Sequence, residues 1–181
     1  SLTITGKNLL NFFNTFDGIP DTVDNCTFGV GGAPADCRGA DTASEFERQV
    51  DKTVSAILEM DADVIGVNEI ENDGYGLDSS LQYLVDELNA ATEAGTYAFI
   101  DVDANTGQLN AMGTDAIKVG LIYKTTSVTP VGQTAALNTV AFVNGGDSAP
   151  RTRPALAQAF EQYSTGARFI VSVNHFKSKG S

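Results

Sequence analysis

The 181-residue sequence has no apolar run long enough to span a membrane, and it shows no internal repeat. A membrane-spanning helix needs about 20 consecutive apolar residues. With 42% hydrophobic residues, the chain is nevertheless long enough to bury one core. The composition therefore predicts a soluble chain with no membrane partner and no domain boundary within residues 1–181.

Positive charge is also scarce, because 11 Lys and Arg residues face 23 Asp and Glu residues, for a net charge of −12. A surface this acidic does not hold a polyanion by bulk electrostatics, so any phosphate chemistry would need a metal ion. The charge is unevenly distributed. Residues 151–181 carry Arg151, Arg153, Arg168, Lys177 and Lys179 against Glu161 alone. This end of the chain either faces an anion or is a solvated edge that balances the acidic remainder.

Only two cysteines are present, Cys26 and Cys37, in the stretch DNCTFGVGGAPADCRG, whose Gly, Asp and Pro content excludes a helix or a central strand. We expect a disulfide that closes this loop, which indicates a secreted, extracellular protein. Two free thiols or half of a metal site are the alternatives, but there is no CxxC motif and no nearby histidine. No signal peptide is visible at Ser1, so we expect a mature or excised segment.

Hydrophobic periodicity predicts a mixed α/β (α+β) layered domain. Ser44-x-x-Glu47 and Ser79-x-x-Gln82 have the spacing of capping boxes and predict two amphipathic helices, the second ending near Gly95. Apolar runs predict strands in KNLLNFFNTF, ADVIGVNEIEN, TYAFIDV, AIKVGLIY, ALAQAF and RFIVSVNHF. The expected order is strand, long loop, helix, strand, helix and then further strands.

Several polar side chains lie at the ends of these predicted strands. Glu69 is costly to bury unless it faces a cation, which predicts a metal ligand, although a glutamate emerging into a loop is an alternative. His175, the only histidine, ends RFIVSVNH beside Asn174 and is either structural or functional. Arg153 precedes ALAQAF, where its guanidinium could bind a phosphate.

Asparagine is unusually frequent in the first predicted strand, at Asn8, Asn11 and Asn14. Because asparagine is disfavoured in strands, we expect one of the three to be held there for function. Strand ends on one edge of a sheet converge, so this asparagine, Glu69, Arg153 and His175 are predicted to meet.

The segments that carry these residues resemble the endonuclease/exonuclease/phosphatase superfamily, which includes pancreatic-type deoxyribonuclease. The matching segments are KNLLNFFNTF, VNEIEN, DAIKVGLIYK, RPALAQAF and VNHFKSKG. VNEIEN and VNHFKSKG are most similar to the secreted bacterial extracellular nucleases of that group. The resemblance implies a layered β-sandwich flanked by helices, of which residues 1–181 supply the N-terminal portion, about the first half.

The resemblance also implies a role for each site residue. Glu69 and Asn8 would hold Mg²⁺ or Mn²⁺, and Asn8 would also contact the scissile phosphate. Arg153 and Asn174 would bind the phosphate. His175 would act on the phosphate or on the leaving oxygen, so that Glu69, Asn8 and His175 form the catalytic set.

The superfamily also requires a Gly-Asp-x-Asn segment and a late Asp-His pair, and the sequence contains neither. In the superfamily's mechanism that Asp orients or deprotonates the attacking water, and that His stabilises the phosphorane. We therefore expect a truncated, inactive fragment that folds only in part. The inner face of its sheet would remain uncovered and would favour self-association.

The implied function is a metal-dependent phosphodiesterase, an extracellular endonuclease that hydrolyses DNA or RNA. The alternatives are a phosphatase or sphingomyelinase-like phosphodiesterase, and a catalytically inactive binding module. Ca²⁺ is a further candidate ligand, because Asp101, Asp103 and Asn105 alternate in DVDANTGQLN as in a calcium loop. No glutamate follows at the EF-hand spacing, so a solvated loop is the alternative.

Overall fold

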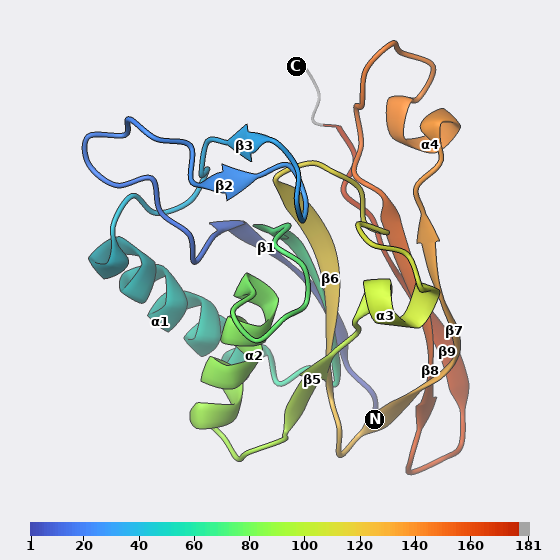
Figure 1. Cartoon of the computed structure of the whole chain (residues 1–181). Coiled ribbons are helices and arrows are strands. Elements are labelled where there is room, and N and C mark those ends of the chain that lie inside the picture. Colours follow the sequence, from blue (N-terminus) through green and yellow to red (C-terminus); the bar gives the residue numbers. More distant parts are fainter. Residues whose placement is uncertain (178–181) are drawn as a thin grey trace.

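The computed structural model describes residues 1–177, which form two packed sheets, a short hairpin and four helices (Figure 1). The first sheet has the strand order β1-β4-β6-β5, with β1 and β4 parallel, and the second is the antiparallel sheet β7-β8-β9. This confirms the predicted layered α/β architecture. In chain order the elements are β1 (Ile4–Phe12), β2 (Cys26–Thr27), β3 (Pro34–Ala35), α1 (Ala43–Met60), β4 (Val64–Glu71), α2 (Ser80–Ala90), β5 (Tyr97–Phe99), α3 (Val102–Thr106), β6 (Ile117–Lys124), β7 (Val128–Leu137), α4 (Val140–Asn144), β8 (Ala155–Gln162) and β9 (Arg168–Val173).

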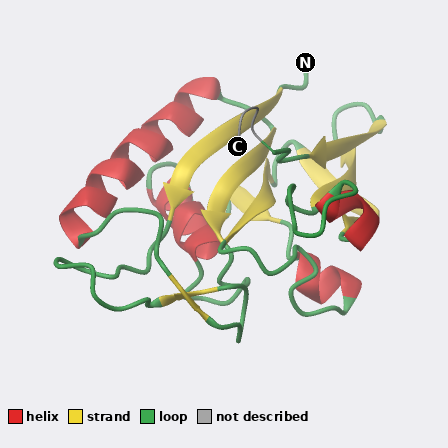
Figure 2. Cartoon of the chain, turned by 90° about the horizontal axis from the view of Figure 1, so that it is seen from above, coloured by secondary structure: helices red, strands yellow, loops and turns green. Residues whose placement is uncertain are grey.

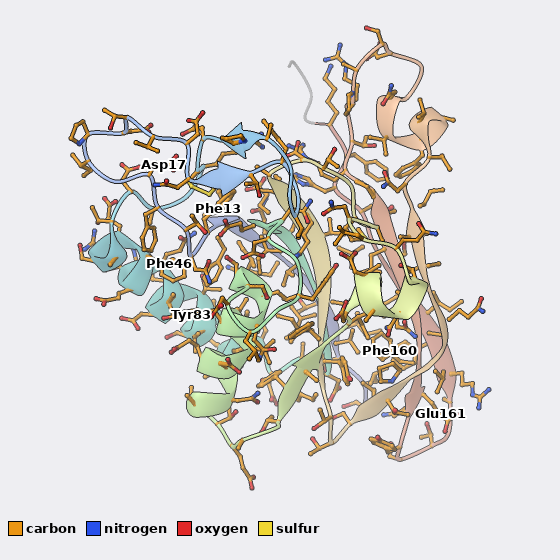
Figure 3. All side chains as sticks on the ribbon, viewed as in Figure 1. Phe13, Asp17, Phe46, Tyr83, Phe160 and Glu161 are labelled. Atoms are coloured by element: carbon orange, nitrogen blue, oxygen red, sulfur yellow. A yellow bond between two sulfur atoms is a disulfide. The ribbon has the colours of Figure 1, made fainter. Side chains whose placement is uncertain are left out.

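The two long helices, α1 and α2, cover one side of the first sheet, and the second sheet lies on its other side (Figure 2). On the helix side, Phe46 of α1 packs against Tyr83 of α2, and both are labelled in Figure 3. Their ring centroids are 5.3 Å apart. Burying one such large apolar side chain stabilises the fold by about 1.5–3 kcal/mol. The core on this side also contains Leu9, Phe12, Val50, Ile57, Ile65, Val67, Ile70, Leu81, Leu84 and Leu88.

A second core lies between the two sheets and fills the space around Phe160 (Figure 3). It is formed by Val64, Val119 and Leu121 from the first sheet together with Leu156, Phe160, Val171 and Val173 from the second. The expectation of an uncovered inner face is therefore wrong, because β7, β8 and β9 of this chain cover it. The expected self-association through an exposed inner face is therefore not supported.

The first helix begins two residues earlier than its predicted capping box. Its N-cap is Thr42, whose side chain accepts the Glu45 N–H, and not Ser44. The second helix begins as predicted, with Ser79 accepting the Gln82 N–H. It ends at Ala90 rather than near Gly95, and the Thr92 hydroxyl, which donates to the Leu88 carbonyl at 2.7 Å, satisfies one acceptor of the last turn.

Sequence periodicity missed β7 and misassigned the end of TYAFIDV. β7 contains Pro130 and Gly132, which disfavour a regular strand, and its register against β8 shifts between Val131 and Ala135 to accommodate them. β5 ends at Phe99, and the short helix α3 follows with Asp101 as its N-cap.

The loop between β1 and α1 contains a disulfide between Cys26 and Cys37, which confirms the predicted pairing. Asp17 organises the loop, since its two carboxylate oxygens accept the backbone N–H groups of Asn25 and Cys37, each at 2.6 Å. Asp17 is labelled in Figure 3 beside the β2–β3 hairpin.

A buried ion pair lies at the start of β6, an interior strand of the first sheet. Lys118 of β6 is fully buried, and its Nζ donates to the Gly74 carbonyl, lies 3.8 Å from Asp73 Oδ1 and lies 4.2 Å above the Tyr75 ring. Burial lowers the pKa of Lys118, and the charge of Asp73 opposes this shift.

No helix within residues 1–177 has the length and apolar character that crossing a bilayer requires.

Candidate metal and phosphate site

Glu69 and His175 come from different sheets and meet at one end of the sandwich. Glu69 Oε1 lies 3.5 Å from His175 Nε2, and the two side chains are only 20% and 17% exposed. His175 lies two residues after Val173, the last residue of β9, and so flanks the strand that it was predicted to end. Glu69 does not end its strand but lies inside β4. The packing of one sheet on the other therefore creates this pair.

The backbone at Glu69 is irregular, which explains how a carboxylate within a strand leaves the core. Glu69 has a φ of 61°, and the register between β4 and β6 shifts between Val67 and Ile70. A residue other than glycine in this left-handed region costs about 1–3 kcal/mol and is retained where the surroundings over-determine it. Bulges of this kind re-aim side chains next to functional sites.

The neighbouring strand β1 is also irregular where it lies beside Glu69 and its neighbours in β4. Asn8 is paired with Asn68, the residue before Glu69, and the register of β1 shifts immediately after Asn8. Leu10 and Asn11 both have positive φ values, 56° and 54°. Asn8 Oδ1 accepts the Leu10 N–H at 2.7 Å, which fixes the amide of Asn8 beside this irregular segment.

The other two asparagines of the first strand serve the fold. The backbone carbonyl of Asn11 accepts from Gln49, and Asn14 donates its side-chain amide to the Asp78 carbonyl at 2.9 Å. The Asn14 N–H donates to Glu71 at 3.1 Å. Asn8 is thus the one whose strand partner, Asn68, directly precedes Glu69.

Arg153 reaches the same end of the sandwich. Its backbone N–H donates to the His175 carbonyl at 3.1 Å, and its Nη2 lies 3.3 Å from Asp115 Oδ2. Asp115 also bonds Arg38 at 3.1 Å. Sequence analysis missed Asp115, and its only signal was a carboxylate immediately before the strand AIKVGLIY.

Asn174 is linked to Asn68 through its backbone carbonyl and not through its side chain. Its carbonyl accepts from Asn68 Nδ2 at 3.5 Å, while its own amide donates to Ser172 Oγ at 3.2 Å. The side chains of Asn8, Asn68 and Asn174 also line an open groove of about 540 Å³ between β1 and β9.

Unpartnered polar atoms gather at this site. Among residues 1–177, five buried side-chain polar atoms have no hydrogen-bond partner, and three of these are Asn68 Oδ1, Arg153 Nε and His175 Nδ1. Buried polar groups in native proteins are nearly always satisfied, so such a concentration indicates a place for water or a ligand.

The electrostatics of the site favour a neutral imidazole. Burial lowers the pKa of His175, and the positive charge of Arg153 lowers it further, whereas Glu69 and Asp115 act in the opposite direction. A neutral histidine can accept a proton on one ring nitrogen while it donates from the other.

Other sequence candidates lie elsewhere. The calcium-loop interpretation is wrong, because Asp101 caps α3 and the Asp103 carboxylate accepts the N–H groups of Asn110 and Ala111, both at 3.0 Å. Of the basic residues near the end of the chain, Lys177 is exposed and Lys179 lies outside the described residues.

Within residues 1–177, one cluster of three aspartates could hold a cation with carboxylate ligands alone. Asp17, Asp21 and Asp36 of the disulfide loop present carboxylate oxygens within 4.8 Å of one another. Partial desolvation raises the pKa of Asp21, and the charge of Asp36 raises it further. Of the three carboxylates, Asp17 has a structural role in the loop, because it accepts two backbone N–H groups.

Comparison with known proteins identifies the fold. No protein-family model matches the sequence, and no curated protein matches it significantly. Among solved structures, a protein of the endonuclease/exonuclease/phosphatase family from Bacteroides thetaiotaomicron matches with a TM-score of 0.55 and 14% identity, over 99% of this chain and 52% of that one.

Two further structures of the same kind are more distant. The catalytic domain of human nocturnin with a bound sulfate anion matches with a TM-score of 0.49 and 16% identity, over 76% of this chain and 45% of that one. An endonuclease/exonuclease/phosphatase protein from Beutenbergia cavernae matches with a TM-score of 0.47 and 18% identity, over 99% and 39%. The chain spans between 39% and 52% of the length of the three solved chains. The match to the Bacteroides thetaiotaomicron protein shows that the chain has the fold of the endonuclease/exonuclease/phosphatase superfamily.

Proposed function

We propose that this chain carries the metal-binding and phosphate-binding part of a divalent-metal-dependent phosphodiesterase that cleaves DNA outside the cell. The observation that carries the proposal is the Glu69–His175 pair, 3.5 Å apart, with unpartnered polar atoms around it. The superfamily fold supports a phosphoester substrate. Because the chain spans about half of the chains it matches, the activity of the whole protein is part of this proposal.

The residues at the site fit a magnesium or manganese ion. Mg²⁺ keeps several waters and is commonly bound by one or two carboxylates together with substrate phosphates, not by a full protein cage. Glu69 supplies one partly exposed carboxylate, and Asn8 supplies an amide oxygen on the adjacent strand. When bound, the metal would polarise a phosphoryl oxygen and lower the pKa of a coordinated water.

The remaining groups of the site would act on the phosphate. Arg153 has its Nε free to donate to a phosphate oxygen, and Asp115 holds the other side of its guanidinium at 3.3 Å. His175, which the site favours in its neutral form, would donate a hydrogen bond to the phosphate or exchange a proton with the leaving oxygen. Asn174 would contact the phosphate from the groove that it lines together with Asn8 and Asn68.

Two observations support an extracellular location and a polyanionic substrate. The Cys26–Cys37 disulfide is typical of proteins from oxidising compartments. The basic side chains Arg151, Arg153 and Lys177 lie in the segment that carries His175, whereas the rest of the chain is strongly acidic. A phosphate-bearing ligand would therefore be guided to this end of the molecule.

Metal binding can be tested on the chain itself. We expect Mn²⁺ titration, followed by electron paramagnetic resonance, to show a site that EDTA empties and that Glu69→Gln weakens at least tenfold. Glu161→Gln is the matched control, because Glu161 pairs with Arg168 at the end of the second sheet that is opposite to His175. If Glu69→Gln bound Mn²⁺ as the wild type does while Asp17→Asn did not, the metal would belong to the disulfide loop and the proposal would be wrong.

The substrate can be tested with the full-length protein on plasmid DNA, bis-nitrophenyl phosphate and sphingomyelin, with and without EDTA. We expect metal-dependent cleavage of plasmid DNA, reduced by a factor of roughly 10²–10⁴ in His175→Ala because proton transfer by a positioned side chain contributes that much. Cleavage of sphingomyelin or of the small ester without DNA cleavage would indicate a different phosphoesterase. Failure to cleave any of the three would indicate a binding module.

A further inference from the structure

Two phenylalanines lie beside the proposed site, and the chemistry outlined above uses neither of them. Phe176 directly follows His175 and is 62% exposed. Its ring centroid lies 6.4 Å from that of Phe142 in α4, with the rings tilted by 59°. Single exposed apolar residues are common on protein surfaces. A paired aromatic surface adjoining a histidine that faces a partly buried carboxylate is a more specific arrangement.

The loop around α4 holds Phe142 in place. Thr139 caps the helix by accepting the Phe142 N–H at 3.3 Å, and the Thr152 hydroxyl donates to the Phe142 carbonyl at 3.2 Å. The Thr152 N–H donates to the Val143 carbonyl at 3.0 Å. Because Thr152 is followed directly by Arg153, the same backbone segment positions the aromatic ring and the phosphate-binding guanidinium.

We propose that Phe142 and Phe176 form a stacking surface for a nucleobase next to the scissile phosphate, so that the substrate is a nucleic acid with an unstacked base. This inference rests on the proposed phosphodiesterase function and makes single strands, loops and frayed ends its preferred substrates over intact duplex. Base stacking on an aromatic ring contributes about 1–3 kcal/mol per base and tolerates any sequence, since every base has a π face.

The charges around the two rings suit this occupant. Lys177 follows Phe176 in the chain, and the backbone of Arg153 is hydrogen-bonded to His175, the residue before Phe176, so two basic residues lie close to the aromatic surface along the backbone. Proteins that bind single-stranded nucleic acid combine such a positive track with stacked aromatic rings. A lipid surface would instead require a larger continuous apolar area than two rings with cationic neighbours.

Duplex DNA is the less suitable substrate on this geometry. In a duplex the faces of the bases are covered by their neighbours, and unstacking one base costs a few kcal/mol. The Phe142–Phe176 surface would therefore contribute to duplex binding only where a base is already displaced.

The experiment measures oligonucleotide binding by this chain in the presence of Mg²⁺, with phosphorothioate linkages that resist hydrolysis. Fluorescence anisotropy would compare a mixed-sequence single-stranded 10-mer, an abasic 10-mer with the same phosphates, and a duplex. We expect the single strand to bind about tenfold more tightly than the abasic strand, which is the factor that 1.4 kcal/mol of stacking produces. Phe176→Ala should remove this advantage and leave abasic binding unchanged, whereas Phe176→Tyr should retain it.

Two controls separate stacking from loss of structure. Tyr163→Ala removes an aromatic side chain that is 59% exposed at the turn between β8 and β9, and it should change no affinity. Phe142→Leu keeps the apolar volume in the α4 loop but removes the ring, so it should reduce single-strand binding without changing urea stability.

The two proposals fail in distinguishable ways. If both the single and the abasic strands bind with equal affinity and Arg153→Ala weakens both, the phosphate site stands and the stacking inference is overturned. If neither strand binds, or if Arg153→Ala has no effect, the proposed function fails and the stacking inference fails with it. Preferential binding of the duplex would also overturn the inference.

Discussion

Val173 of β9 lies so close to the backbone of Gly66 in β4 that a Cβ atom at Gly66 would come within 2.8 Å of Val173 Cγ2. This contact sets the distance between the two sheets near the site. His175 follows Val173 by two residues, and Glu69 follows Gly66 by three. The absence of a side chain at Gly66 therefore allows the carboxylate and the imidazole to meet.

Gly66→Ala is expected to lower the free energy of unfolding by about 1–3 kcal/mol, the usual cost of overpacking a core. Urea denaturation followed by circular dichroism would measure it. Gly6→Ala is the matched control on the adjacent strand, since a Cβ there would meet only the Gly66 carbonyl oxygen at 4.0 Å. Adding Val173→Ala to Gly66→Ala should recover part of the loss, and equal stabilities of all variants would contradict the close contact.

Lys118→Met is expected to destabilise the fold by about 3–5 kcal/mol, because removing one member of a buried ion pair leaves the other charge uncompensated. Asp73 would lose the nearby ammonium, and the Gly74 carbonyl would lose its donor. The double variant Lys118→Met with Asp73→Asn should be more stable than Lys118→Met alone.

The control for this prediction lies on the same strand. Lys124 pairs with Asp61, whose side chain is 85% exposed, so Lys124→Met should cost less than about 1 kcal/mol. A loss at position 124 as large as that at position 118 would show that burial does not determine the strength of these pairs.

Glu71 should make stability depend on pH. Burial raises its pKa, and the charge of Asp73 raises it further, while hydrogen bonds from Ser80 and Thr15 act in the opposite direction. One of its oxygens, Oε1, lies 3.3 Å from the Cys26 sulfur, which carries no proton because it is in the disulfide. The fold therefore favours the protonated carboxyl group.

The stability contributed by protonated Glu71 is fully present below the unfolded pKa, near 4.5, and is lost as the pH rises through the raised pKa of the folded state. Glu71→Gln should remove this dependence, so that its unfolding free energy rises relative to wild type between acidic and neutral pH. Urea titrations at several pH values would test this. Glu59→Gln, on the exposed side of α1, should follow the wild-type profile.

Removing the disulfide with Cys26→Ser and Cys37→Ser is expected to cost about 2–3 kcal/mol, the chain-entropy estimate for a loop of this size. Reduced wild-type protein should unfold at the same urea concentration as the double variant. Mass spectrometry without reductant provides the direct check on protein from an oxidising compartment. Two thiols that react with an alkylating reagent would contradict both the pairing and the argument for secretion.

Much of the fold was predictable because local burial leaves a periodic pattern. The predicted helix over Leu81, Leu84 and Leu88 and the run around Ile65 and Val67 are present as α2 and β4. Asn8, Glu69, Arg153 and His175 were recognisable as candidates because each is a polar residue near an apolar run or at a strand end. The Cys26–Cys37 pairing followed from composition alone.

The tertiary structure decided what local patterns do not contain. Sequence periodicity describes which side of an element is buried, but it does not describe what covers that side or where one strand shifts against another. The cover that β9 provides over β4, the left-handed backbone at Glu69 and the contact of Arg153 with Asp115 all depend on partners far apart in the chain. The sequence by itself therefore determined which polar side chains are candidates for a phosphate site, and the packing of Val173 on Gly66 decided that two of them, Glu69 and His175, lie together.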